Sequence, residues 1–144
     1  PRFMELLERA TGKGLKVTIS TNGTRITPEA AARFKELGVA YVGISLDGIG
    51  AVHDKFRGVE GSFEQAVRGF RLCSEVGQKT GLRLTLTRNN VQCMGQILDF
   101  IDANDIQRVC FYHLVPTGRG VEVQTLTQEE QPVQSMTDGI IAKR

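Results

Sequence analysis

Short strand patterns alternate with helical patterns along this sequence, and that alternation limits what it can fold into. Four segments, 15–20, 41–47, 82–87 and 109–115, carry apolar residues at nearly every second position, as β-strands do. The stretches between them carry apolar residues three and four apart, as amphipathic helices do. The expected strands start 26, 41 and 27 residues apart, which is long enough for right-handed crossovers between parallel strands. The pattern therefore predicts an α/β protein with a parallel sheet, arranged as a barrel, part of a barrel or a doubly wound sheet.

Helix starts and stops are marked between these strands. Thr27 precedes Pro28 as an N-cap precedes the first helical position, and Gly38 ends that helix. Ser62 and Gln65 have the spacing of a capping box, which predicts a helix starting at Ser62 and fraying at Gly77 and Gly81. Other helices are expected at 3–10 and 94–104 and, despite Pro132, at 127–136, and a loop at 48–61 with one helical turn at 51–56.

The strand at 41–47 has two unlike sides. Val42, Ile44 and Leu46 share one side, while Gly43, Ser45 and Asp47 share the other. A parallel strand covered on both faces is normally apolar on both. If these small polar groups filled a closed barrel, each unpaired one would cost about 1–3 kcal/mol. We therefore expect an open partial barrel whose inner face meets a polar ligand, with a merely solvated face as the alternative. The neighbouring strands repeat the pattern with Thr18, Ser20, Arg83 and Thr85.

Composition excludes several classes of protein. The 144 residues are 40% hydrophobic and 24% charged, as expected for one folded domain covering residues 1–144. A net charge of +2 argues against a nucleic-acid partner, and no apolar run approaches the roughly 20 residues that span a membrane. The start at Pro1 shows no leader pattern and suggests a cut piece. Cys73, Cys93 and Cys110 have neither zinc nor disulfide spacing, which fits a reducing cytoplasm.

Polar residues gather where the strands are expected to end. In parallel β/α folds the active site lies at the carboxyl ends of the strands. Here those ends offer hydroxyls, amides, one acid and two arginines. No catalytic triad, zinc motif or phosphate loop appears, so no catalytic residue and no metal ligand is assigned within this chain. These side chains are expected to position a ligand, while a cofactor supplies the difficult chemistry.

Several of these segments resemble the radical S-adenosylmethionine (SAM) enzymes. The resemblance rests on Ser20-Thr21-Asn22-Gly23, Ile44-Ser45-Leu46-Asp47-Gly48, His53-Asp54, Arg57-Gly58 and Gly61-Ser62-Phe63. It implies an open (β/α)6 partial TIM-type barrel, of which this chain would supply strands three to six. It also implies a [4Fe–4S] cluster that cleaves SAM to a 5′-deoxyadenosyl radical. The family's Cys-x3-Cys-x2-Cys loop and Gly-Gly-Glu-Pro motif are absent from these residues, so the fragment alone is expected to be inactive.

The segment Cys110 to Gly120 further resembles members that modify haem precursors. The resemblance implies a tetrapyrrole substrate and an electron donor such as flavodoxin or ferredoxin. A radical SAM peptide maturase and a non-catalytic α/β binding module are the alternatives. An open sheet edge left by missing strands is expected to make the fragment self-associate.

The resemblance also implies roles for individual residues. Thr21 and Asn22 would lie near the methionine end of SAM, and Ser45 would bond the ribose with Asp47 beside it. Turn formation is the alternative for Asn22 and Asp47. Arg88 would face the methionine carboxylate, unless it is only a solvated loop charge. The full cofactor-binding set is Thr21, Asn22, Ser45, Asp47, Arg88, Leu114 and Val115, the last two through their backbone against adenine.

The histidines and the charged residues of the 48–61 loop are expected to have mainly structural roles. His53, Asp54 and Arg57 are predicted to hold the 48–61 loop together, with Arg57 donating to backbone carbonyls or to Asp54. His113 is expected to be a core histidine, with a tetrapyrrole carboxylate contact as the alternative. Gly118-Arg119-Gly120 is a further candidate for binding such a carboxylate.

Overall fold

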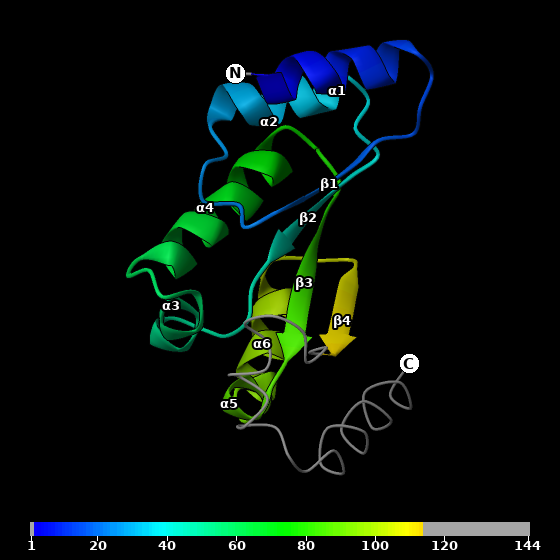
Figure 1. Cartoon of the computed structure of the whole chain (residues 1–144). Coiled ribbons are helices and arrows are strands. Elements are labelled where there is room, and N and C mark those ends of the chain that lie inside the picture. Colours follow the sequence, from blue (N-terminus) through cyan, green and yellow to red (C-terminus); the bar gives the residue numbers. More distant parts are fainter. Residues whose placement is uncertain (1, 114–144) are drawn as a thin grey trace.

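The computed structural model describes residues 2–113 and contains one parallel sheet. Its four strands lie in the order β1-β2-β3-β4, and every neighbouring pair is parallel (Figure 1). Each connection is therefore a crossover that carries one or more helices. This confirms the predicted α/β class with sequential βα units. The strands are β1 Thr18–Thr21, β2 Tyr41–Ser45, β3 Thr80–Leu86 and β4 Val109–His113.

Helix α4 covers the face of the sheet, and two short helices lie at the end where the strands point. Helix α4 contacts β2 and β3 and packs against both α2 and α3. Helices α3 and α5 lie toward the arrowheads of the strands (Figure 1). The helices are α1 Arg2–Gly12, α2 Pro28–Glu36, α3 Ala51–Arg57, α4 Ser62–Glu75, α5 Arg88–Val91 and α6 Met94–Ala103. None of those described here is long and apolar enough to cross a membrane.

The strand register separates an apolar face from a polar one. Ser20 pairs with Gly43 and Gly43 with Gly81, while Ser45 pairs with Arg83. Thr85 pairs with Tyr112 on the same side, because residues paired across parallel strands point the same way. The prediction that the small and polar positions share one face is confirmed. The opposite face carries Val42, Ile44, Leu82 and Leu84, all with no exposed surface, under the helices.

Some element boundaries differ from those predicted. Thr27 is an N-cap as expected, since its Oγ1 accepts a hydrogen bond from Ala30 N at 3.2 Å. Ser62, however, is the first residue of α4 rather than its N-cap, and its hydroxyl donates to Asp54 Oδ1 at 2.9 Å. The capping-box prediction there was wrong, because a nearby carboxylate takes the hydroxyl. A capping box instead joins Thr87 and Asn90 at the start of α5.

The ends of other elements shift as well. Strand β1 begins at Thr18 rather than at residue 15, and β3 begins at Thr80 and includes Gly81, which was expected to end a helix. On α1 only Leu7 is buried, whereas Phe3 and Leu6 of the predicted apolar stripe are 52% and 65% exposed. The predicted segments after residue 113, including the helix at 127–136, lie outside the described residues.

Candidate functional site

The turn after β1 is built by its own side chains. Thr21 Oγ1 accepts a hydrogen bond from Gly23 N at 3.1 Å. Asn22 Oδ1 accepts from the backbone N of Thr24 at 3.3 Å and from its hydroxyl at 3.1 Å. Gly23 has φ +78°, a conformation that residues with a Cβ rarely adopt. The turn is thus fixed, with Asn22 exposed and Thr21 half-buried at the carboxyl end of the strand.

Helix α4 comes unusually close to this turn. A Cβ added to Gly69 of α4 would lie only 2.7 Å from the carbonyl oxygen of Gly23. A Cβ on Gly23 would itself lie 2.6 Å from Ile44 Cγ2. These two glycines let the helix, the turn and β2 meet without a gap. Sequence reasoning missed Gly69, because one glycine within a helical pattern gives no signal of what it faces.

Asp47 is the centre of a buried network at the carboxyl end of β2. Its side chain has no exposed surface. Oδ1 accepts a hydrogen bond from Thr85 N at 2.8 Å, so the carboxylate ties the end of β2 to β3. Oδ2 makes an ion pair with Arg57 without a well-aligned hydrogen bond. The backbone N of Asp47 donates to His53 Nδ1 at 3.0 Å. Both carboxylate oxygens are thus occupied inside the protein.

Asn90 completes this network from the other side. Its amide nitrogen donates to the carbonyl oxygens of Thr85 at 2.7 Å and Asp47 at 3.0 Å. Its Oδ1 accepts from Thr87 N at 2.8 Å. A buried asparagine that joins the ends of two strands was not predicted, although the Thr-x-x-Asn spacing of 87–90 was a visible signal.

The loop after β2 is held as predicted, but with a different pairing. Asp54 accepts hydrogen bonds from Gly61 N at 2.7 Å, from Phe63 N at 2.8 Å and from the Ser62 hydroxyl. The bond from Phe63 N is the largest cause lowering the pKa of Asp54, and partial burial opposes it. Arg57 pairs with Asp47 and not with Asp54, which corrects the expected partner. The physical reason is that both Asp54 carboxylate oxygens already accept hydrogen bonds from residues 61–63.

The hydrogen bond that His53 accepts favours its neutral form. Its Nδ1 accepts the Asp47 backbone hydrogen, so a proton on that nitrogen would break the bond. Burial, followed by the charge of Arg57, lowers the pKa of His53, while Asp47 and Asp54 act in the opposite direction.

This geometry predicts a pH dependence. The folded-state pKa of His53 lies below its unfolded value of about 6.5. The neutral imidazole therefore makes its full contribution to the free energy of unfolding above pH 6.5. That contribution is lost as the pH falls from 6.5 toward the lowered folded-state pKa. The free energy of unfolding, measured with urea at pH 7.5 and pH 5.0, should fall less for His53→Asn than for the wild type. The asparagine amide oxygen can accept the same hydrogen bond but does not titrate. Equal losses in the two proteins would show that His53 is not the titrating group.

The predicted cofactor residues fall into three groups. Thr21, Asn22 and Ser45 lie at the carboxyl ends of adjacent strands, and Ser45 is half-buried on the polar face. The Ser45 hydroxyl takes part in none of the side-chain hydrogen bonds found within residues 2–113. Asp47 is enclosed in its network. Arg88 is the first residue of α5, and Leu114 and Val115 lie outside the described residues.

An iron–sulfur cluster does not fit the described residues. Among residues 2–113 no three His, Cys, Asp or Glu side chains are grouped to hold a metal ion. Cys73 is fully buried in the core, and burial raises the pKa of its thiol to about 11, which disfavours the thiolate that iron requires. No step of a reaction is therefore assigned to a cluster held by these residues.

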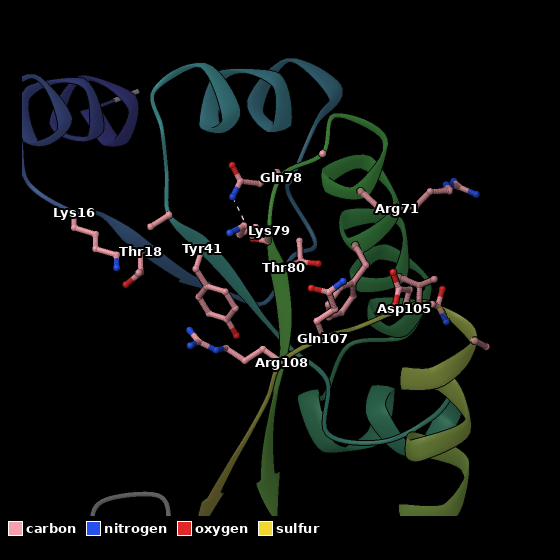
Figure 2. Close-up of a pocket in the computed structure, with 17 residues that line it drawn as sticks. Lys16, Thr18, Tyr41, Arg71, Gln78, Lys79, Thr80, Asp105, Gln107 and Arg108 are labelled. Carbon is pink, nitrogen blue, oxygen red and sulfur yellow. Dashed lines mark hydrogen bonds between the residues drawn. The ribbon is translucent and has the colours of Figure 1, made fainter. Parts of the chain in front are cut away.

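The large hollow shown in Figure 2 lies at the opposite end of the sheet. It has a volume of about 910 Å³ and surrounds the amino ends of the strands, where Thr18, Tyr41, Thr80 and Arg108 line it. Because ligands of parallel β/α folds bind at the carboxyl ends of the strands, this hollow is not the predicted cofactor site.

The sheet topology and its polar face define a βα-repeat core of the partial-barrel class. The sequence model of the Radical SAM superfamily matches residues 1–101. The chain belongs to the radical SAM superfamily.

Relatives within the superfamily include two synthases and a maturase. The Fe-coproporphyrin III synthase of Methanosarcina barkeri is 48% identical over 88% of this chain and 32% of its own length. The pre-heme d1 synthase of Dinoroseobacter shibae is 44% identical over 80% of this chain and 28% of its own length. A mycofactocin maturase of Mycobacterium ulcerans is 40% identical over 85% of the chain and 33% of its own length. The chain thus spans about a third of these relatives.

A solved structure shares the fold. The Streptococcus suis protein SuiB bound to S-adenosylmethionine superposes with a TM-score of 0.71 at 17% identity, covering 96% of this chain and 32% of that one. At this identity the likeness supports the fold alone. It agrees with the partial TIM-type barrel that the family resemblance implied.

Proposed function

We propose that this chain forms strands three to six of a radical SAM catalytic core that modifies a haem precursor. The 48% identity to an Fe-coproporphyrin III synthase carries the proposal. The remaining strands and the cluster ligands would come from outside these 144 residues. A bound cluster with SAM would supply the radical chemistry, and this chain would supply binding and orientation.

Within this proposal the polar strand ends cradle SAM. Ser45 would donate to or accept from the ribose, because its hydroxyl is half-buried and free within the described residues. Thr21 and Asn22 would shape the neighbouring edge through their turn. Arg88, Leu114 and Val115 keep their proposed contacts with SAM. For Asp47 we propose a different role, holding the strand ends in register through Thr85, Arg57 and His53.

The decisive experiment uses a complete gene product that includes these residues. The protein is reconstituted anaerobically with iron and sulfide, reduced, and supplied with SAM and either a tetrapyrrole haem precursor or an acidic peptide. The proposal predicts formation of 5′-deoxyadenosine together with a mass change in the porphyrin. A mass change in the peptide alone would favour the maturase alternative, which the mycofactocin relative supports less strongly. No SAM cleavage with any substrate would favour a binding module.

The 144 residues alone should bind no cluster and cleave no SAM. The described part groups no metal ligands, and the three cysteines are too far apart in sequence for a cluster loop. Reconstitution of the isolated chain should leave an ultraviolet-visible spectrum without the broad absorbance of a [4Fe–4S] cluster. A stable cluster absorbance with matching iron and sulfide content would contradict this.

The proposed function also implies a cellular compartment and an electron donor. A reducing cytoplasm suits three free cysteines and an oxygen-sensitive cofactor. Electrons would come from a small redox protein such as flavodoxin or ferredoxin. Self-association through the open edge of the sheet at β1 stays a prediction.

A further inference from the structure

The polar face of the sheet carries positive charge and almost no negative charge. By strand alternation Lys16, Lys79, Arg83 and Arg108 all belong to this face. Figure 2 shows Lys16, Lys79 and Arg108 directed to the same side of the sheet as Tyr41. None of the four is paired with a carboxylate within residues 2–113. Asp47, which continues this face beyond β2, is already neutralised by Arg57.

Two of these cations are held in place by tyrosines. The Arg83 guanidinium carbon lies 4.5 Å from the centre of the Tyr112 ring, and that of Arg108 lies 5.1 Å from the Tyr41 ring. Such contacts keep a guanidinium oriented while leaving its N–H groups free to donate. Both arginines lie near the Tyr41 hydroxyl, where they oppose the burial that raises the pKa of this phenol to about 12.

Glycines on the adjacent strands make room for this arrangement. A Cβ on Gly43 would lie 2.7 Å from Arg83 Cδ, so the arginine stem lies directly across the backbone of β2. A Cβ on Gly81 would overlap the Tyr41 ring in the same way, across β3. The Tyr41 hydroxyl is buried between these groups without a hydrogen-bond partner in the described part of the chain. The face therefore holds oriented donors and one unsatisfied hydroxyl.

We propose that Arg83 and Arg108, oriented by Tyr112 and Tyr41, bind carboxylates at the rim of the haem precursor. This inference rests on the proposed function and adds the groups that recognise the substrate. Planar guanidinium groups bind carboxylates through two parallel hydrogen bonds. Arg83 stands in the same row as Ser45, and Arg108 lies two positions before Cys110, which shares that row. At about 3.3 Å per residue, carboxylates spread around a flat macrocycle can reach both arginines.

The test measures binding rather than turnover. Coproporphyrin III, which carries four carboxylates, is titrated into the complete, cluster-loaded protein and followed by its absorbance band. Arg83→Gln and Arg108→Gln should each weaken binding about 10-fold to 100-fold, as expected for lost hydrogen bonds between charged groups. Arg83→Lys keeps the charge and the stem across Gly43 but loses the planar fork, so an intermediate affinity is expected. Arg68→Gln is the matched control, because Arg68 is exposed on α4.

Two further readouts separate recognition from folding and from SAM binding. Affinity for the wild type should fall as salt rises from 0.1 M to 1 M, whereas binding of the tetramethyl ester of the porphyrin should be weak at every salt concentration. SAM affinity should be the same in the wild type and in both glutamine variants. If Arg83→Gln fails to fold, Arg83→Lys and the salt series still decide the question.

The results distinguish failure of the arginine assignment from failure of the proposed function. If the wild type binds coproporphyrin III and the glutamine variants bind as tightly as Arg68→Gln, the assignment of Arg83 and Arg108 is wrong and the proposed function stands. The same conclusion follows if the ester binds as well as the acid, since carboxylates would then not be recognised. If the wild type binds no porphyrin but binds an acidic peptide, both this assignment and the haem-precursor function fail.

Discussion

Replacing Asp47 by alanine is expected to lower the free energy of unfolding by about 3 kcal/mol, near the lower end for a broken buried ion pair. The substitution leaves Arg57 without its partner and Thr85 N without an acceptor. The lower end applies because the Arg57 side chain is 31% exposed and water can partly replace the lost contact. Urea unfolding followed by circular dichroism measures the difference.

Two further variants make the interpretation of Asp47→Ala sharper. Asp47→Asn keeps the shape and an acceptor for Thr85 N but loses the charge, so it should cost less than alanine. Asp99→Ala removes an exposed carboxylate from α6 and should change stability by less than about 0.5 kcal/mol. If Asp47→Ala leaves stability unchanged but lowers affinity for SAM, Asp47 is a ligand-binding residue, as the family resemblance first implied.

Gly69→Ala should destabilise the protein by about 1–3 kcal/mol, the usual cost of forcing a group into a packed site. Alanine is a better helix former than glycine by about 1 kcal/mol, so helix propensity alone predicts the opposite sign. The steric clash should outweigh helix propensity, because the added Cβ would lie 2.7 Å from the Gly23 carbonyl oxygen. That oxygen belongs to the backbone and cannot move aside as a flexible side chain could.

Gly95→Ala provides the matched control for this prediction. Gly95 lies in α6, and a Cβ there would have nothing within 4 Å. This substitution should stabilise the protein slightly or leave it unchanged. The account of α4 against the β1 turn would be contradicted if the Gly69 and Gly95 variants had the same stability.

Local signals in the sequence predicted the elements and the two faces of the sheet. The alternation of Val42, Gly43, Ile44 and Ser45 is a property of neighbouring residues, and the strand register confirms what it indicated. The Thr27 cap was predicted for the same reason, since its partner lies three residues away.

What the sequence did not predict depends on contacts between distant segments. Asp47 before a glycine has the same local pattern whether it binds a ligand, forms a turn or ties two strands together. Its role follows from Thr85 and from Asn90, which binds the Asp47 carbonyl 43 residues away in sequence. Ser62 had a capping-box spacing, yet Asp54 lies close enough to take its hydroxyl.

We propose that the carboxyl ends of β1, β2 and β3 hold SAM, and hydrogen–deuterium exchange of the complete protein tests this placement. Adding SAM should slow exchange at residues 21–25, 45–48 and 85–90, while helix α1 and the amino ends of the strands stay unchanged. Protection confined to the hollow around Tyr41 and Lys79, or no protection at the three strand ends, would contradict the account.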